Sequence, residues 1–177
     1  GLLLRREIEQ LNEAVESPSR PFLAVLGGAK VSDKLSAIEN IAKRVDTILI
    51  GGAMAYTFLL GQGVSVGASR VEKSVVAQSA QMLGRLEKAG VKVLLPIDHV
   101  GARELSDQAR PEVFNHGIPD GRVGLDIGPK TVQQYSGIIA NAKTIYWNGP
   151  IGVFEHPHFA NGTRTLAEVI AMHSRQH

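Results

Sequence analysis

The chain has 177 residues, of which 44% are hydrophobic and 20% charged, the balance of an ordinary globular domain. Its formal net charge is +2 and its Lys and Arg residues form no dense cluster, so we expect no nucleic-acid partner. The absence of cysteine excludes disulfides, thiolate zinc sites and cysteine nucleophiles, and no apolar run is long enough for a membrane helix. We therefore expect a soluble, cytoplasmic protein that binds no membrane.

Apolar runs and amphipathic segments alternate along the first half of the chain. We expect a leading helix within residues 1–20, where the apolar side chains of Leu2–Glu16 share one helical face. Continuous apolar runs, typical of strands buried on both faces of a parallel sheet, follow at Phe22–Leu26, Thr47–Ile50 and Lys92–Leu95. Helices are predicted after Ser32, a candidate cap, and over Ala53–Leu60 and Val71–Ala89, the last being the longest of the chain.

The second half repeats this alternation after an irregular stretch. Residues Ile97–Arg122 show weak periodicity, and we expect a long excursion with one or two short strands there. Strands are then predicted at Val123–Ile127 and Thr144–Trp147, and helices at Thr131–Ala142 and near Thr163–Met172. The alternation predicts an α/β fold: a doubly wound, mostly parallel sheet with helices on both faces, in a Rossmann-like three-layer arrangement. We expect one domain over residues 1–177, with the α/β body at 21–172 and an atypical tail at 173–177.

Four of the predicted strands run into glycine, at Gly28, Gly52, Gly128 and Gly149. In a sheet of this kind, ligands bind beyond the carboxyl ends of the strands. Glycine lets the backbone turn sharply there and lets a ligand approach closely. The sequence therefore predicts a binding site where the four glycine-bearing ends gather on one edge of the sheet.

The first glycine turn, LGGAKVSDK at Leu26–Lys34, carries two lysines to the start of the next helix. A cation at a helix N-terminus is unfavourable, whereas an anion bound there is stabilised. The four-residue spacing of Lys30 and Lys34 can place both on one helix face. We interpret the turn as a phosphate site, with a simple strand-to-helix turn and two solvated lysines as the alternative. The turn has neither a Walker sequence nor the dinucleotide fingerprint.

Two other motifs suggest different chemistry. Gly63–Gly67 matches the G-x-S-x-G string of serine hydrolases, but that motif requires a strand before Ser65, and here a helix-like segment precedes it. His156 and His158 suggest a metal site, but no third ligand cluster accompanies them. We expect neither motif to be catalytic, and we expect the chain itself to supply no metal ligand.

The string WNGPIGVFE, Trp147–Glu155, combines a strand end, a turn and an acidic residue. Val153 and Phe154 can offer apolar contact to a flat base, while Glu155 can accept hydrogen bonds from ribose hydroxyls. In the alternative, purely structural interpretation Trp147 only fills the core. The pattern leaves both interpretations open.

Taken together, the strings LGGAKVSDKL, ILIGGAMAYTFL, GLDIGPKT, TIYWNGPIGVFE and FANGT resemble the phosphoglycerate kinase family, specifically its bacterial-type nucleotide-binding C-terminal domain. The resemblance covers nearly the whole chain. It implies reversible phosphoryl transfer between 1,3-bisphosphoglycerate and Mg-ADP, giving 3-phosphoglycerate and ATP, as a step of glycolysis. ADP or ATP with Mg²⁺ would be the ligand of this part.

The resemblance also implies roles for individual residues. Lys30 would contact the transferring phosphoryl group as the catalytic lysine, and Lys34 would hold the nucleotide phosphates. The other nucleotide-binding positions would be Gly27, Gly28, Gly51, Gly52, Gly124, Leu125, Asn148, Pro150, Val153 and Glu155. Among these, Leu125 would lie near the base and Glu155 would contact the ribose. Ala53 stands where the family often has a third glycine.

Some family features have no counterpart in these 177 residues. They are the N-terminal domain that binds phosphoglycerate, the last strand or strands, and the GGGD stretch with its metal-linked aspartate; the ending HSRQH also departs from the family. The resemblance therefore implies a fragment with most of the nucleotide half-site, inactive alone, which binds ADP weakly or not at all and can self-associate through exposed apolar surface. The alternatives are a non-catalytic module that pairs with a missing chain, a serine hydrolase, and an NAD-dependent oxidoreductase, which the missing fingerprint disfavours.

Overall fold

A computed structural model describes residues 18–176, so the predicted leading helix at Leu2–Glu16 lies outside the described residues. The strands are β1 (Phe22–Leu26), β2 (Thr47–Ile50), β3 (Lys92–Leu94), β4 (Asp98–Ala102), β5 (Glu112–Asn115), β6 (Val123–Ile127) and β7 (Thr144–Asn148). The α-helices are α2 (Leu35–Ala42), α3 (Met54–Gly61), α4 (Val76–Lys88), α5 (Pro129–Asn141) and α6 (Asn161–Gln176). Two short 3-10 helices, η1 (Lys73–Val75) and η2 (Pro157–Phe159), precede α4 and α6.

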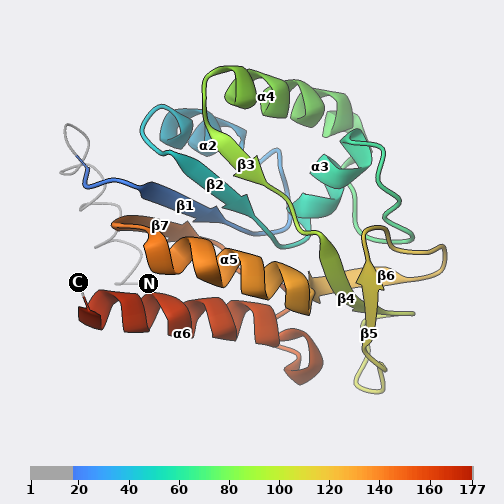
Figure 1. Cartoon of the computed structure of the whole chain (residues 1–177). Helices are drawn as coiled ribbons and strands as arrows, with labels where there is room; N and C mark the ends of the chain where they lie inside the picture. The colour runs from blue at the N-terminus through green and yellow to red at the C-terminus, as the bar shows by residue number, and fades with distance from the viewer. Residues whose placement is uncertain (1–17, 177) are drawn as a thin grey trace.

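The main sheet is parallel and has the order β3-β2-β1-β7 (Figure 1). From β1 the chain first builds outward through β2 and β3, and then returns to place β7 on the other side of β1. The strand order therefore reverses between β1 and β7. In doubly wound sheets, the carboxyl ends of the strands at such a switch point form the ligand crevice.

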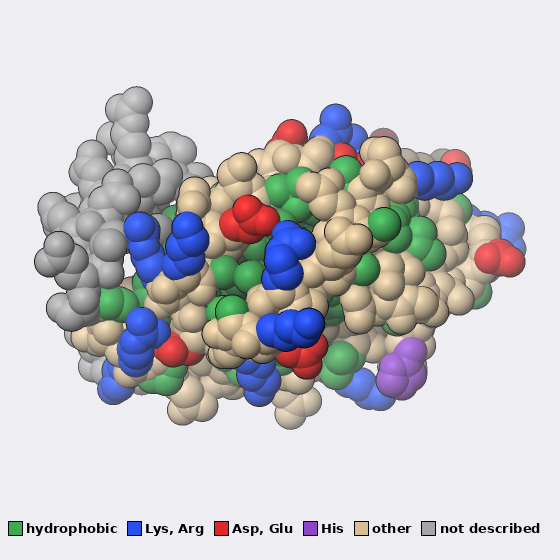
Figure 2. All heavy atoms as spheres, turned by 90° about the horizontal axis from the view of Figure 1, so that it is seen from above, with side chains coloured by type: hydrophobic (Ala, Val, Ile, Leu, Met, Phe, Trp, Pro, Cys, Tyr) green, Lys and Arg blue, Asp and Glu red, His purple; other side chains and the backbone are tan. Residues whose placement is uncertain are grey.

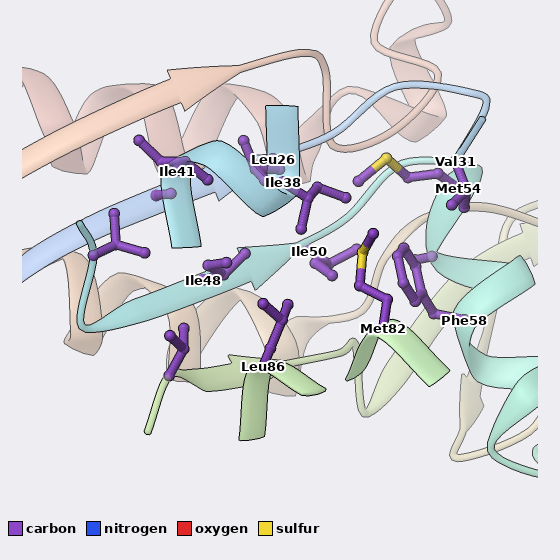
Figure 3. Close-up of a cluster of buried hydrophobic side chains, with 14 of the residues drawn as sticks. Leu26, Val31, Ile38, Ile41, Ile48, Ile50, Met54, Phe58, Met82 and Leu86 are labelled. Carbon is purple, nitrogen blue, oxygen red and sulfur yellow. The ribbon is translucent and has the colours of Figure 1, made fainter. Parts of the chain in front are cut away.

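Helices cover both faces of this sheet, because alternate residues of its strands point to opposite sides. On one face, Phe22, Ala24 and Leu26 of β1 pack in a cluster with side chains of α2, α3 and α4 (Figure 3). On the other face, Leu23 and Val25 pack against α5 and α6. The predicted α/β class with a parallel sheet between two helical layers is confirmed.

The predicted strand Val123–Ile127 forms as β6, but it does not join the parallel sheet. It pairs antiparallel with β4 in a second sheet of order β5-β4-β6, at one end of the molecule (Figure 1). The expected excursion at Ile97–Arg122 supplies both partners of this sheet. Because β6 belongs to this second sheet, the expectation that all four glycine ends meet on one edge of the parallel sheet is wrong. Gly128, which follows β6, packs against the carboxylate of Asp98.

Three other local predictions differ from the structure. The segment predicted as one helix over Val71–Ala89 is helical only from η1 onward, and α6, with 16 residues, is longer than α4. Ser32 does not cap α2, because Lys34 is the N-cap residue and the Ser32 hydroxyl donates to Glu72 instead. The atypical ending continues α6 as far as Gln176.

On the face of the molecule seen in Figure 2, Lys and Arg side chains are interspersed with Asp and Glu. Such a mixed distribution gives the exposed helices a solvated polar surface. Among the described residues, no helix has both the length and the apolar character needed to cross a membrane.

Candidate functional site

Three glycine-bearing strand ends interlock at the switch point. The Gly27 amide donates to the Asn148 carbonyl at 2.8 Å, and the Gly28 amide donates to the Pro150 carbonyl at 3.0 Å. The Gly52 amide donates to the Ile151 carbonyl at 2.7 Å, which ties in the end of β2. Glycine is required here because a Cβ on Gly27 would lie 2.1 Å from the Pro150 carbonyl oxygen. The same backbone hydrogen bonds fix the relative positions of the loops that follow β1, β2 and β7.

A cavity of about 340 Å³ opens beside these loops, with mostly apolar walls. Seven of the predicted nucleotide-binding residues line it: Gly28, Gly52, Gly124, Leu125, Pro150, Val153 and Glu155. The neighbouring glycines Gly27 and Gly51 lie behind the wall, packed against Pro150 and Ile151. Phe154 does not line the cavity, although the sequence suggested it as a contact for a base, and its side chain is exposed.

Sequence reasoning missed several side chains of the cavity wall, and the largest of them are Tyr56, Arg70 and Leu105. Tyr56 belongs to a helix with six buried residues, so its sequence context indicates only core. Its phenol packs so closely against Gly124 that a Cβ on Gly124 would lie 2.4 Å from the Tyr56 hydroxyl oxygen. Leu105 comes from the loop between β4 and β5, where the sequence shows no periodicity. Its side chain remains 53% exposed, so it forms an outer wall of the cavity.

The two lysines do not share a helix face as predicted, because α2 begins only at Leu35. Lys34, the N-cap residue, donates a hydrogen bond from its ammonium group to the side-chain oxygen of Asn148. Lys34 and Asn148 line a second, adjoining depression of about 620 Å³ rather than the apolar cavity. Lys30 lies on the exposed loop before α2, where Glu72 is a nearby opposite charge. The loop therefore holds two cations beside the glycine turn, each facing a different partner.

Asp126, on β6, is a buried carboxylate behind the cavity wall. Its oxygens accept hydrogen bonds from the backbone amides of Ile127 and Gly162, both at 2.9 Å, so it holds β6 against the first turn of α6. Burial raises the pKa of Asp126 from 3.8 to about 6, although both amide hydrogen bonds oppose this shift. Burial, and secondarily the charge of Asp126, raise the pKa of Tyr56, which keeps the phenol protonated.

Among the described residues, the two motifs that suggested other chemistry, Gly63–Gly67 and the pair His156 and His158, lack the geometry that this chemistry requires. Ser65 follows the helix α3 and not a strand, so the geometry of a nucleophile elbow is absent there. The His156 ring donates from Nε2 to the Ser106 carbonyl at 2.8 Å, since its Nδ1 accepts from the His158 amide at 3.2 Å. Within residues 18–176, no group of three or more His, Cys, Asp and Glu side chains is arranged to hold a metal ion.

Comparison with known proteins indicates the family of the chain. A family model described as phosphoglycerate kinase matches residues 1–177. A phosphoglycerate kinase of Clostridium perfringens is 50% identical over 171 residues, which make up 97% of this chain and 43% of that protein. A phosphoglycerate kinase of Anaeromyxobacter sp. is 50% identical over 172 residues, again 97% of this chain and 43% of the relative.

Solved structures show the same relationship. The structure of phosphoglycerate kinase from Coxiella burnetii matches 97% of this chain and 45% of its own, with a TM-score of 0.90 and 41% identity. That of phosphoglycerate kinase from Pyrococcus horikoshii matches 97% and 44%, with a TM-score of 0.79 and 30% identity. The chain thus spans less than half the length of these relatives. It belongs to the phosphoglycerate kinase family.

Proposed function

We propose that this chain forms the nucleotide-binding half of a phosphoglycerate kinase, which transfers a phosphoryl group between 1,3-bisphosphoglycerate and Mg-ADP in glycolysis. The observation that carries the proposal is the apolar cavity at the switch point, with Glu155 on its wall and the lysine-bearing loop beside it. Its size and apolar walls suit a flat base. Leu125 and Val153 supply apolar contact to the base, and Glu155 accepts hydrogen bonds from the ribose hydroxyls.

The phosphates would then extend past Gly28 toward the two lysines. Lys34 is close to this path, since its Cε lies 3.4 Å from the position that a Cβ on Gly28 would take. Phosphoryl transfer depends mainly on positioning and on neutralising the charge of the transferring group. Lys34 would exchange its bond to Asn148 for a phosphate oxygen, and Lys30 would stabilise the transferring phosphoryl group.

Mg²⁺ is proposed to enter with the nucleotide, coordinated mainly by phosphate oxygens and water. This is a usual mode of binding for Mg²⁺, which rarely uses a cage made of protein side chains alone. It fits the absence of a cluster of metal-ligating side chains among residues 18–176. The ion would offset phosphate charge that the two lysines leave unbalanced.

Calorimetric titration with adenosine and with Mg-ADP tests the proposal. We expect weak binding of both ligands, with Mg-ADP the tighter of the two. Lys34→Ala should weaken Mg-ADP binding by about tenfold while leaving adenosine binding unchanged, because a charge-assisted hydrogen bond to phosphate is lost. Lys43→Ala, at the opposite end of α2, is the matched control and should change neither affinity. Equal weakening of both ligands, or no binding by the unaltered chain, would contradict the proposal.

A further inference from the structure

Glu72 reaches from the segment between α3 and α4 to the loop that carries Lys30. Its Oε1 accepts a hydrogen bond from the Ser32 amide at 3.1 Å, and its Oε2 accepts one from the Ser32 hydroxyl at 2.6 Å. The backbone of Glu72 is itself held, because its amide donates to the Thr57 hydroxyl of α3 at 3.1 Å. The carboxylate therefore connects the lysine loop to a buried helix.

Val31, which lies between Lys30 and Ser32, is anchored in a different way. Val31 is 0% exposed and packs in the core cluster with residues such as Met54 of α3 (Figure 3). Val31 and Ser32 are thus both tied to the same region of the fold, one by apolar burial and the other by two hydrogen bonds. Lys30 directly precedes these two anchors, so the backbone position of Lys30 depends on both.

The electrostatic environment agrees with this arrangement. Desolvation raises the pKa of Glu72, but the hydrogen bonds from Ser32 and Val31 and the charge of Lys30 outweigh it and lower the pKa below its ordinary value. The carboxylate is ionised at neutral pH. Together with Asp33 of the loop itself, it places negative charge near the N-terminus of α2.

We propose that Glu72 is a positioning residue for phosphoryl transfer: through Ser32 it holds the loop in the conformation that presents Lys30 to a nucleoside polyphosphate. This inference rests on the proposed function, since it assumes that Lys30 faces the outer phosphate. Preorganisation of this kind reduces the ordering cost when the ligand binds. We expect the effect at the polyphosphate end of the ligand, because the lining of the cavity proposed for the base includes neither Lys30 nor Ser32 nor Glu72.

The test uses the whole chain and four variants: Glu72→Ala, Glu72→Gln, Ser32→Ala and the control Glu39→Gln. Glu39 is a fitting control because it also makes a contact between distant parts of the sequence, pairing with Arg85 at 3.1 Å, but on the exposed surface and outside the lysine loop. Hydrogen exchange of the Val31 and Ser32 amides reports the order of the loop without any ligand. Calorimetry with Mg-ATP and with adenosine then reports the consequence for binding.

We expect Glu72→Ala to speed exchange at Ser32 and to weaken Mg-ATP binding by about tenfold, with adenosine affinity unchanged. Ser32→Ala should act in the same direction to a smaller extent. Glu72→Gln keeps an acceptor for the Ser32 amide, so it should restore most of the Mg-ATP affinity, and Glu39→Gln should have no effect. If Glu72→Ala leaves exchange at Ser32 unchanged, or weakens both ligands equally, the positioning role is wrong. If the unaltered chain binds neither ligand, the proposed function fails, while the exchange data still decide whether Glu72 orders the loop.

Discussion

Some glycines of this chain are required by close packing and others are not, and substitutions of Gly27 and Gly84 compare the two cases. Gly27 lies where β1 and β7 meet, and a Cβ there would lie 2.1 Å from the Pro150 carbonyl oxygen and 2.9 Å from that of Gly149. Gly27→Ala should therefore lower the free energy of unfolding by about 3 kcal/mol or more, because two backbone segments must separate. Gly84, inside α4, has open space at its Cβ position, so Gly84→Ala should raise the same quantity by about 0.5–1 kcal/mol. Urea unfolding of both variants measures the two effects, and a Gly27→Ala chain as stable as the original would contradict the packing described here.

Asp126 makes the stability of the protein depend on pH in an unusual direction for a carboxylate. Its pKa is raised from 3.8 to about 6 in the folded state, so as the pH rises from 4 to 6 the unfolded chain loses the proton first. The free energy of unfolding therefore falls through this window, by about 3 kcal/mol in total for this group, and the loss is complete only about one unit above the folded pKa, near pH 7.

Asp126→Asn removes this titration, while other groups such as His99 titrate in both proteins. The difference in unfolding free energy, variant minus original, should therefore become more positive between pH 4 and pH 7. Urea titrations at several pH values measure this difference. A difference that stays constant, or that decreases as the pH rises, would show that Asp126 is not held protonated by burial.

At the scale of elements, the central strands β1 and β2 of the parallel sheet could be predicted because they are apolar runs, as expected of strands buried on both sides. The edge strands β3 and β7 are only partly buried, but each still contains a short apolar run. The partner of β6 could not be predicted, since β4 and β5 contain glycine, charged residues and only short apolar stretches. The glycines that line the cavity after β1 and β2 could be predicted because they follow the ends of strands. Leu105 and Tyr56 reach the cavity through tertiary packing, which leaves no local pattern in the sequence. The directions of Lys30 and Lys34 depend on where α2 begins, which is the least predictable feature of a helix.

The loop between β4 and β5, which carries Leu105, is held in place by His156. The hydrogen bond from its Nε2 to the Ser106 carbonyl connects this loop to the segment that bears Glu155. His156→Ala should weaken adenosine binding by about threefold, because the outer wall of the cavity becomes less ordered before binding. His158→Ala is the control: it removes the ring contact with His156 but keeps the hydrogen bond to His156, which comes from the backbone amide of residue 158. Fluorescence or calorimetric titration with adenosine measures both variants, and equal affinities for the two would contradict the role of His156.

At the scale of the whole molecule, the chain contains the cavity proposed for a nucleotide but spans only about 43% of the relatives that it matches. Phosphoryl transfer requires the acceptor to be placed in line with the nucleotide, which a site for the base and phosphates alone does not achieve. We expect no turnover of 1,3-bisphosphoglycerate with Mg-ADP by these 177 residues in a coupled assay. Turnover above the background rate would show that this chain also positions the acceptor.

The central claim is that a nucleotide binds in the cavity at the switch point between β1 and β7. Titration of the isotope-labelled chain with Mg-ADP, followed by amide chemical shifts, tests it most directly. The account predicts saturable shifts at Gly28, Gly52, Gly124, Leu125 and Val153, the backbone that surrounds the cavity. The absence of saturable shifts at millimolar ligand, or shifts that gather instead around the depression between Leu83 and Val93, would contradict it.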